Sequence, residues 1–234
     1  MSLRPVLLIA LNFVRMQWVT VLIMGFYLVS IAALFAYNEQ RQEVSFFFQS
    51  HAFYVLFLGS MLAIPAIQTE RKSRRILAVL SKGVGRQQYL SGLVGGVTIA
   101  CTIYCVALGI TGSWTLGEAG FSVQQVWFLM LYLVAASMLA GTTALMFSTF
   151  LNPFFAAGAT AIVLGLPALA AHVGARWEYV IPVYSLSAAV LKSSFKAAGS
   201  PLWFPLGLAV LETIVFWVLA ARIFSRMDIA VSVE

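Results

Sequence analysis

The chain runs from Ala119 to Ala175 without a single Asp, Glu, Lys or Arg. That run is far longer than the roughly 20 apolar residues with which one α-helix crosses the hydrocarbon core of a bilayer. Of the 234 residues, 62% are apolar and only 9% are charged, whereas soluble domains carry about 25% charged residues. This composition excludes a soluble enzyme, a nucleic-acid-binding domain and a disordered chain. The sequence therefore predicts an integral membrane protein without a nucleic-acid partner.

Uncharged apolar segments divide the chain into six predicted spans, which we treat as one transmembrane domain over residues 1–234. Asn152-Pro153 splits the longest run, because proline removes a helical hydrogen-bond donor and clashes with the preceding turn. The predicted spans cover residues 18–37, 51–67, 89–111, 123–147, 154–172 and 201–221. The expected fold is all-α.

Basic residues indicate on which side of the membrane each loop lies. With six spans, the two termini and the loop between spans two and three share one side, which holds 10 of the 14 Lys and Arg residues. Cytoplasmic loops collect Lys and Arg, so both termini are expected in the cytoplasm. In segment 3–17, Arg4, Asn12 and Arg15 share one helical face, which predicts a helix lying in the cytoplasmic interface. The alternative is that this segment extends the first span.

Few residues have the pattern of a catalytic or metal site. The sequence contains no P-loop, no zinc-protease motif and no serine-hydrolase motif. We therefore expect no catalytic residue, metal ligand or cofactor in this chain. Glu212 is the one acid in the middle of a span, where a carboxylate costs about 2.5–3.5 kcal/mol on insertion scales. It should face protein or water, in a transport path, in a helix pair or in a wet crevice without a transport role.

Other intramembrane patterns are typical of helix packing. Gly92-x-x-x-Gly96 and Ala136-x-x-x-Ala140 permit close contact between helices. Two further groups lie at helical spacing: Cys101 and Cys105 on span three, and Tyr54, Phe57 and Met61 on span two. The cysteines are expected to pack rather than to bind a metal. The aromatic and methionine stripe predicts a packing face, with a substrate path as the alternative.

The loop between spans two and three is the most informative segment. Its charged first half, from Glu70 to Arg75, leads into apolar residues that group on one side of a helix, and Gly83 and Gly85 are suited to end that helix. We expect a short amphipathic helix around 70–82 at the cytoplasmic surface. Its charge could serve only to set topology and to contact lipid headgroups.

The order of residues in this loop resembles that of ABC-2 type permeases, the membrane subunits of ABC exporters. The matching residues are Glu70, Arg71, Leu80, Ser81, Arg86, Tyr89 and Gly92. The sequence departs from the family pattern at Arg74-Arg75, where Gly-Thr is usual, at Gly83-Val84-Gly85, where Pro-x-Ser is usual, and at Leu93, where Lys is usual. Six spans, cytoplasmic termini, an interfacial N-terminal helix and a long outward segment (here 174–200) also agree with that family.

The resemblance implies a permease subunit of an ATP-driven exporter in the bacterial cytoplasmic (inner) membrane. Its implied partners are a separate P-loop ATPase, which carries ATP and magnesium, a second permease copy, the lipid bilayer and envelope accessory proteins. The residues expected to contact the ATPase or to anchor the coupling helix are Glu70, Arg71, Arg74, Arg75 and Arg86. Glu212, Tyr54, Phe57 and Met61 are the candidates for a pathway or for helix pairing.

Two other classes of function compete with this interpretation. One is a membrane anchor or scaffold subunit of an envelope complex that transports nothing. The other is an intramembrane enzyme, for which the spans offer neither paired acids nor a nucleophile with its base. Co-purification of an ATPase that this chain stimulates would favour the permease over both.

Overall fold

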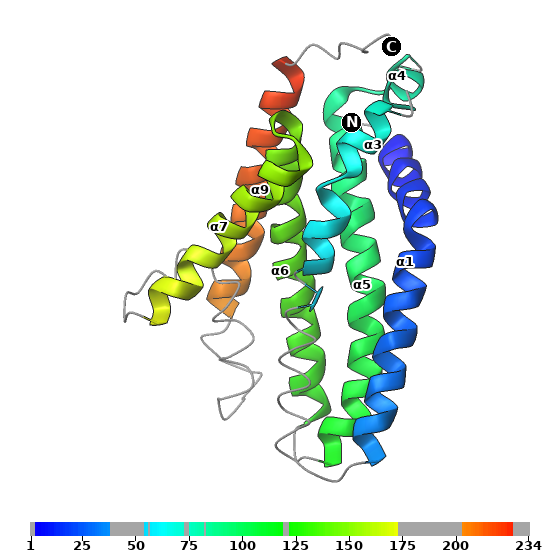
Figure 1. Cartoon of the computed structure of the whole chain (residues 1–234), viewed down its shortest axis with the longest axis vertical. Coiled ribbons are helices and arrows are strands. Elements are labelled where there is room, and N and C mark those ends of the chain that lie inside the picture. The colour runs from blue at the N-terminus through cyan, green and yellow to red at the C-terminus, as the bar shows by residue number, and fades with distance from the viewer. Residues whose placement is uncertain are drawn as a thin grey trace.

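The computed structural model of the protein describes residues 3–37, 54–55, 57–72, 75–81, 83–118, 122–172 and 203–226. The elements within these ranges are all helices, and four of them contain a segment long and apolar enough to cross a membrane. These four are α1 (Leu3–Tyr37), α5 (Arg86–Glu118), α6 (Val123–Phe150) and α9 (Trp203–Arg226). They form an elongated bundle in which α1 begins and α9 ends at the same end of the molecule (Figure 1). The predicted all-α class is confirmed for the described residues, and the four apolar helices are compatible with a membrane protein.

The other two predicted spans are not among these four. The span expected at 154–172 corresponds to α7 (Pro153–His172), which leans away from the bundle axis in Figure 1. The side chains of α7 are described as far as Leu166, and within them the apolar stretch is Pro153–Leu166. The span expected at 51–67 is helical at 54–55 and 57–63, and its first residues lie outside the described part. The outward segment at 174–200 also lies outside it.

The second predicted span ends earlier than expected, at a proline. The helix gives way to a turn at Ile64-Pro65, and the chain continues as α3 (Ala66–Lys72) and α4 (Arg75–Leu80). Proline has no backbone N–H to continue the helical hydrogen bonds, which explains a break before residue 67. The expected coupling helix is thus two short helices. Gly83 follows α4 with φ of 79°, a left-handed conformation that suits glycine, and so ends this segment as predicted.

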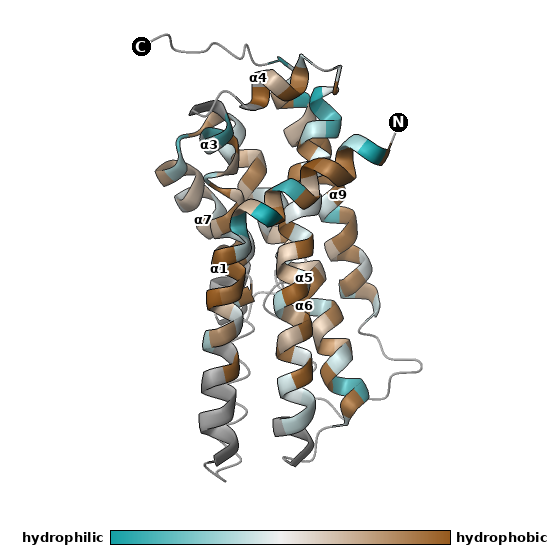
Figure 2. Cartoon of the chain, turned by 90° about the vertical axis from the view of Figure 1, so that its right-hand side faces the viewer, coloured by the Kyte–Doolittle hydropathy of each residue, from teal (hydrophilic) through white to brown (hydrophobic). Residues whose placement is uncertain are grey.

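Helix α1 is continuous but bent. Its assignment runs unbroken from Leu3 to Tyr37, as expected if segment 3–17 extends the first span. Figure 2 shows, however, that the N-terminal part lies obliquely across the top of the bundle before the helix turns down beside α5. The leucines of this oblique part face outward: Leu3, Leu7, Leu8 and Leu11 are each at least half exposed. The segment combines helical continuity with the orientation of an interfacial helix.

Small residues on α5 allow the oblique part of α1 to approach closely. A Cβ atom built on Gly92 would lie 2.6 Å from Ile9 Cβ, and one built on Gly96 would lie 2.8 Å from Phe13 Cβ. Real side chains do not reach such distances, so both positions require glycine for this crossing. The predicted packing role of Gly92-x-x-x-Gly96 is confirmed, with α1 as its partner.

Helix α6 occupies the centre of the described bundle. It packs against α5, α7 and α9, and more of it is buried than of any other spanning helix. Ser122 and Gln125 form a capping box at its start, which satisfies two of the free backbone donors of the first turn. At its end, Asn152 Oδ1 accepts from the Phe155 backbone N–H at 3.0 Å and begins α7. Asn152-Pro153 therefore separates the two helices as the sequence predicts.

We expect Gly92→Ala to lower the free energy of unfolding by about 1–3 kcal/mol, because the added methyl group overlaps Ile9 and must push α1 away from α5. Thermal unfolding of the purified chain in detergent measures the effect. Gly158→Ala is the matched control, since nothing lies within 4 Å of its new Cβ. Alanine there should be neutral or slightly stabilising. Equal stability of the two variants would contradict the close crossing.

Candidate functional site

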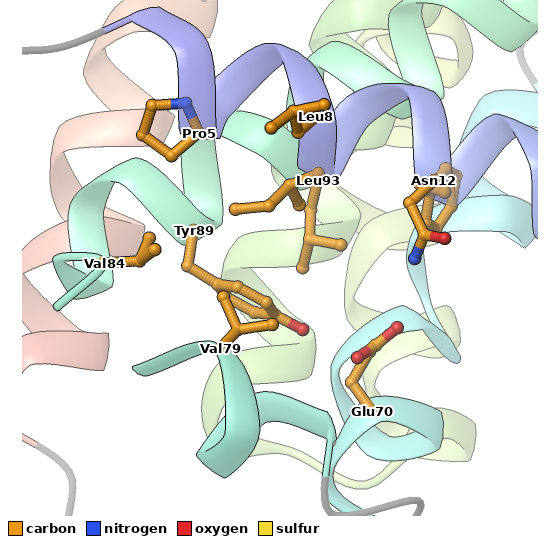
Figure 3. A pocket seen from close by; sticks show the side chains of 10 residues that line it. Pro5, Leu8, Asn12, Glu70, Val79, Val84, Tyr89 and Leu93 are labelled. Atoms are coloured by element: carbon orange, nitrogen blue, oxygen red, sulfur yellow. The ribbon is translucent and has the colours of Figure 1, made fainter. Parts of the chain in front are cut away.

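A cavity of about 290 Å³ lies where the oblique part of α1 covers α3, α4 and α5. Most of its wall is apolar, and three polar side chains reach it (Figure 3). They are Asn12, Glu70 and Tyr89. The apolar lining residues are Pro5, Leu8, Ile9, Phe13, Val79, Val84 and Leu93. The volume is near the lower limit of the range for small-molecule sites in proteins.

The residues of α1 that line the cavity all lie on one face of that helix. Its lining residues fall at positions 5, 8, 9, 12 and 13, which lie on one face of an α-helix. Ile9 and Phe13 also contact the glycines of α5. The close crossing of α1 over α5 therefore fixes the position of one wall of the cavity. Asn12, which the sequence grouped with Arg4 and Arg15, lines the cavity beside the apolar residues of this face.

Glu70 and Tyr89 bring two buried polar groups to the cavity. Glu70, on α3, exposes 9% of its surface, and Tyr89, on the first turn of α5, exposes 1%. Figure 3 shows the Tyr89 hydroxyl directed toward the side of the cavity where the Glu70 carboxylate lies, and the two groups interact electrostatically. The Tyr89 hydroxyl is buried, and Glu70 is the group with which it interacts, through its charge and as a hydrogen-bond acceptor.

Arg86 ties the start of α5 to the end of α9. Its Nη1 donates to the backbone carbonyls of Phe224 at 3.2 Å and Ser225 at 2.9 Å. These carbonyls belong to the last turn of α9, which has no further helical donors and carries the negative end of the helix dipole. One turn along α5, the ring of Tyr89 stacks on Phe224 with centroids 6.4 Å apart. Tyr89 thus contacts α9 with its ring while its hydroxyl faces the cavity.

The structure describes the side chains of only some of the residues that were expected to contact an ATPase or to anchor the coupling helix. Glu70 faces the cavity, and Arg86 donates to the backbone carbonyls at the end of α9. Arg71 and Arg75 belong to α3 and α4, but their side chains, and the whole of Arg74, lie outside the described residues.

The candidates for a pathway lie away from the cavity. Tyr54, Phe57 and Met61 are each about half exposed, so this stripe forms part of the outer surface of the chain. Glu212 is partly buried on α9, and its Oε2 is buried with no hydrogen-bond partner in the described part of the chain. These residues are not brought together with Glu70 and Arg86.

The cysteines and the alanine pair lie in the core. Cys101 and Cys105 are both buried and unoxidised. Within the described residues, no group of three His, Cys, Asp or Glu side chains could hold a metal ion. Ala136 and Ala140 are buried on α6. All four positions are consistent with the packing role that their spacing suggested.

Sequence reasoning missed Asn12 and Tyr89 as site residues. A signal existed for each: Asn12 interrupts an apolar helical face, and Tyr89 lies one turn after Arg86 at the start of a span. Neither signal says that the two side chains line one cavity with Glu70, because that depends on how α1, α3 and α5 lie relative to one another.

We expect Arg86→Gln to loosen the end of α9, because the carbonyls of Phe224 and Ser225 lose a charged donor. The free energy of unfolding should fall by about 1–2 kcal/mol. Hydrogen exchange at residues 220–226 should become faster. Arg222→Gln, which removes an exposed charge from the same helix, is the matched control and should leave exchange unchanged. Equal exchange in both variants would refute the cap.

We expect Glu212→Leu to raise the thermal unfolding midpoint of the isolated chain, because the buried Oε2 lacks a partner and replacing such a group with an apolar side chain is often stabilising. The increase should correspond to about 1–3 kcal/mol. Glu212→Gln, which keeps the size of the side chain, is the control. A lower midpoint for both variants than for the unmodified chain would mean that the carboxylate stabilises the chain.

No protein-family model matches this sequence, and no curated protein has a significant similarity to it. Functional assignment therefore depends on the composition, the loop pattern and the joint that α1, α3, α4, α5 and α9 form at one end of the bundle.

Proposed function

We propose that this chain is the transmembrane permease subunit of an ATP-driven ABC exporter. The observation that carries the proposal is the joint around α3 and α4. Glu70 on α3 and Val79 on α4 line the cavity under α1, and Tyr89 connects that cavity to the end of α9. Helix α4 packs against α3, and α3 packs against α6, so a force applied to α4 would reach the centre of the bundle through α3.

Such a joint suits a subunit that converts movement of an external partner into movement of helices. Exporters of this kind switch by rigid-body shifts of packed elements, and packed elements transmit force because their interiors resist compression. The chain has no P-loop, so ATP and magnesium would bind to a separate ATPase subunit. We propose that the ATPase docks at α4, whose Ala78 is exposed.

The proposal includes the arrangement in the membrane. The chain would cross the bacterial cytoplasmic membrane six times, with both termini and the α3–α4 segment in the cytoplasm, where Lys and Arg accumulate. A second permease copy would cover part of the apolar outer surface. Glu212 on α9 and the stripe formed by Tyr54, Phe57 and Met61 would contribute to the cargo path or to helix pairing.

If the ATPase docks at α4, a charge introduced on the exposed side of that helix should weaken binding. Ala78→Glu places a negative charge on the exposed side of α4, and an unpaired charge buried in an interface costs about 2–5 kcal/mol. We expect the ATPase encoded with this chain to bind the variant at least tenfold more weakly and to lose cargo-stimulated hydrolysis. Co-purification and a phosphate-release assay measure the two effects.

Gln124→Glu is the matched control, because it adds the same charge to an exposed position at the opposite end of the bundle, in the first turn of α6. It should leave association and hydrolysis unchanged. A scaffold without a transport role predicts no stimulated hydrolysis in the unmodified chain. Normal association and hydrolysis in Ala78→Glu would refute docking at α4.

A further inference from the structure

Exposed tryptophans gather at the end of the bundle where α5 ends and α6 and α9 begin (Figure 1). Trp114 on α5 is 63% exposed, Trp127 on α6 is 41% exposed, and Trp203 at the start of α9 is 52% exposed. Trp203 also packs edge-on against Phe128, the residue after Trp127, with ring centroids 5.1 Å apart. Membrane proteins concentrate tryptophan at the boundary between headgroups and acyl chains. This end of the bundle therefore has the residues of an aromatic belt.

The opposite end of the same helices carries positive charge. Arg222 and Arg226 are exposed in the last turns of α9, and Arg86 begins α5. Arg86 lies level with the end of α9, because its Nη1 donates to the Phe224 carbonyl at 3.2 Å. An arginine at the end of a span keeps its guanidinium among headgroups and water while its stem crosses apolar surface. Two different kinds of boundary residue thus mark the two ends.

The length of helix between these ends matches the thickness of a bilayer core. At 1.5 Å per residue, α9 extends about 32 Å from Trp203 to Phe224, and α5 extends about 30 Å from Tyr89 to Gly109. The two segments share both of their ends. Tyr89 stacks on Phe224, and a Cβ atom built on Gly109 would lie 3.3 Å from the ring of Trp127. The hydrocarbon core of a bilayer is about 30 Å thick.

The surface between the two ends is apolar and exposed. On α9, Leu211, Ile214 and Val215 are each more than half exposed, and on α5, Ile103 is 47% exposed. Between these ends α5, α6 and α9 carry a single charged residue, Glu212. An apolar surface of this extent marks contact with lipid or with another protein. The aromatic rim and the basic rim favour lipid.

We propose that the hydrocarbon core of the bilayer covers the bundle from the level of Trp127 and Trp203 to the level of Tyr89 and Phe224. The two tryptophans then bind the headgroup boundary of one leaflet. Helix α4, which lies at the tip of the other end in Figures 1 and 2, is outside the core. Glu212 is about 14 Å from Trp203 along α9, near the middle of the core.

This placement also explains the depth of the oblique part of α1. It crosses α5 at Gly92 and Gly96, about 5–10 Å inside the level of Tyr89. Interfacial helices bury their apolar face to that depth. The inference rests on the membrane insertion proposed above, but neither on the ATPase nor on which end is cytoplasmic.

Depth-dependent fluorescence quenching tests the placement. The full chain with Trp203 as its only tryptophan, the others being replaced by phenylalanine, is reconstituted into phosphatidylcholine vesicles with a quencher at the headgroup or at the end of the acyl chain. We expect the headgroup quencher to reduce Trp203 emission about twofold more than the chain-end quencher. Leu211→Trp in the chain without other tryptophans is the matched control, because Leu211 is 58% exposed and about 12 Å further along α9.

The control should reverse the order of the two quenchers. The same order in both proteins would overturn the placement. A Trp203 that neither quencher reaches would also overturn it, because another protein, such as a second copy, would then cover the belt. Failure of the chain to insert into vesicles would overturn the membrane assignment itself. A lack of ATPase binding or an inverted orientation would leave the quenching unchanged.

A second measurement uses the unmodified chain, so it does not depend on the folding of those variants. The unfolding midpoint is measured in phosphatidylcholine bilayers with acyl chains of increasing length. A mismatch between protein and bilayer costs free energy for each ångström, so the midpoint should be highest where the hydrocarbon core is about 30 Å thick. A maximum in a core about 10 Å thinner or thicker would overturn the placement.

Discussion

The arrangement of the described helices depends on one close contact, the crossing of α1 over α5. Ile9 and Phe13 rest on the backbone of α5 because Gly92 and Gly96 have no side chains there. In lipid, where apolar surfaces gain little by associating, such backbone proximity is a main source of helix attraction. The crossing holds α1 oblique, and the oblique helix forms one wall of the cavity that Glu70 and Tyr89 share.

Much of the fold follows from patterns that a single sequence contains. The uncharged runs, the break at Asn152-Pro153 and the capping pattern of Ser122 and Gln125 are local, and the structure has helices that agree with them. The early end of the second span at Pro65 was also within reach of sequence reasoning, since proline at that position interrupts the helical hydrogen bonds. Local chemistry sets where these helices begin and end.

The site was harder to predict from the sequence than the helices were, because it depends on which helices meet. The loop pattern singled out Glu70 and Arg86, but the direction in which each side chain points depends on the helices that pack around it. Glu70 turns inward because α1 covers α3, and Arg86 reaches the end of a helix far along the chain. Hydrophobic periodicity places a residue on a face of its own helix, and it carries no information about the helix opposite.

The cap on α9 has a consequence for the order in which the protein is made. Arg86 and Phe224 are separated by 138 positions in the sequence, and chains emerge from the ribosome N-terminal end first. The start of α5 must therefore wait for almost the entire remaining chain before it can hold the last turn of α9. Until then the arginine remains at the start of α5 without this partner. The contact that fastens the end of α9 is thus among the last long-range contacts of the fold that can form.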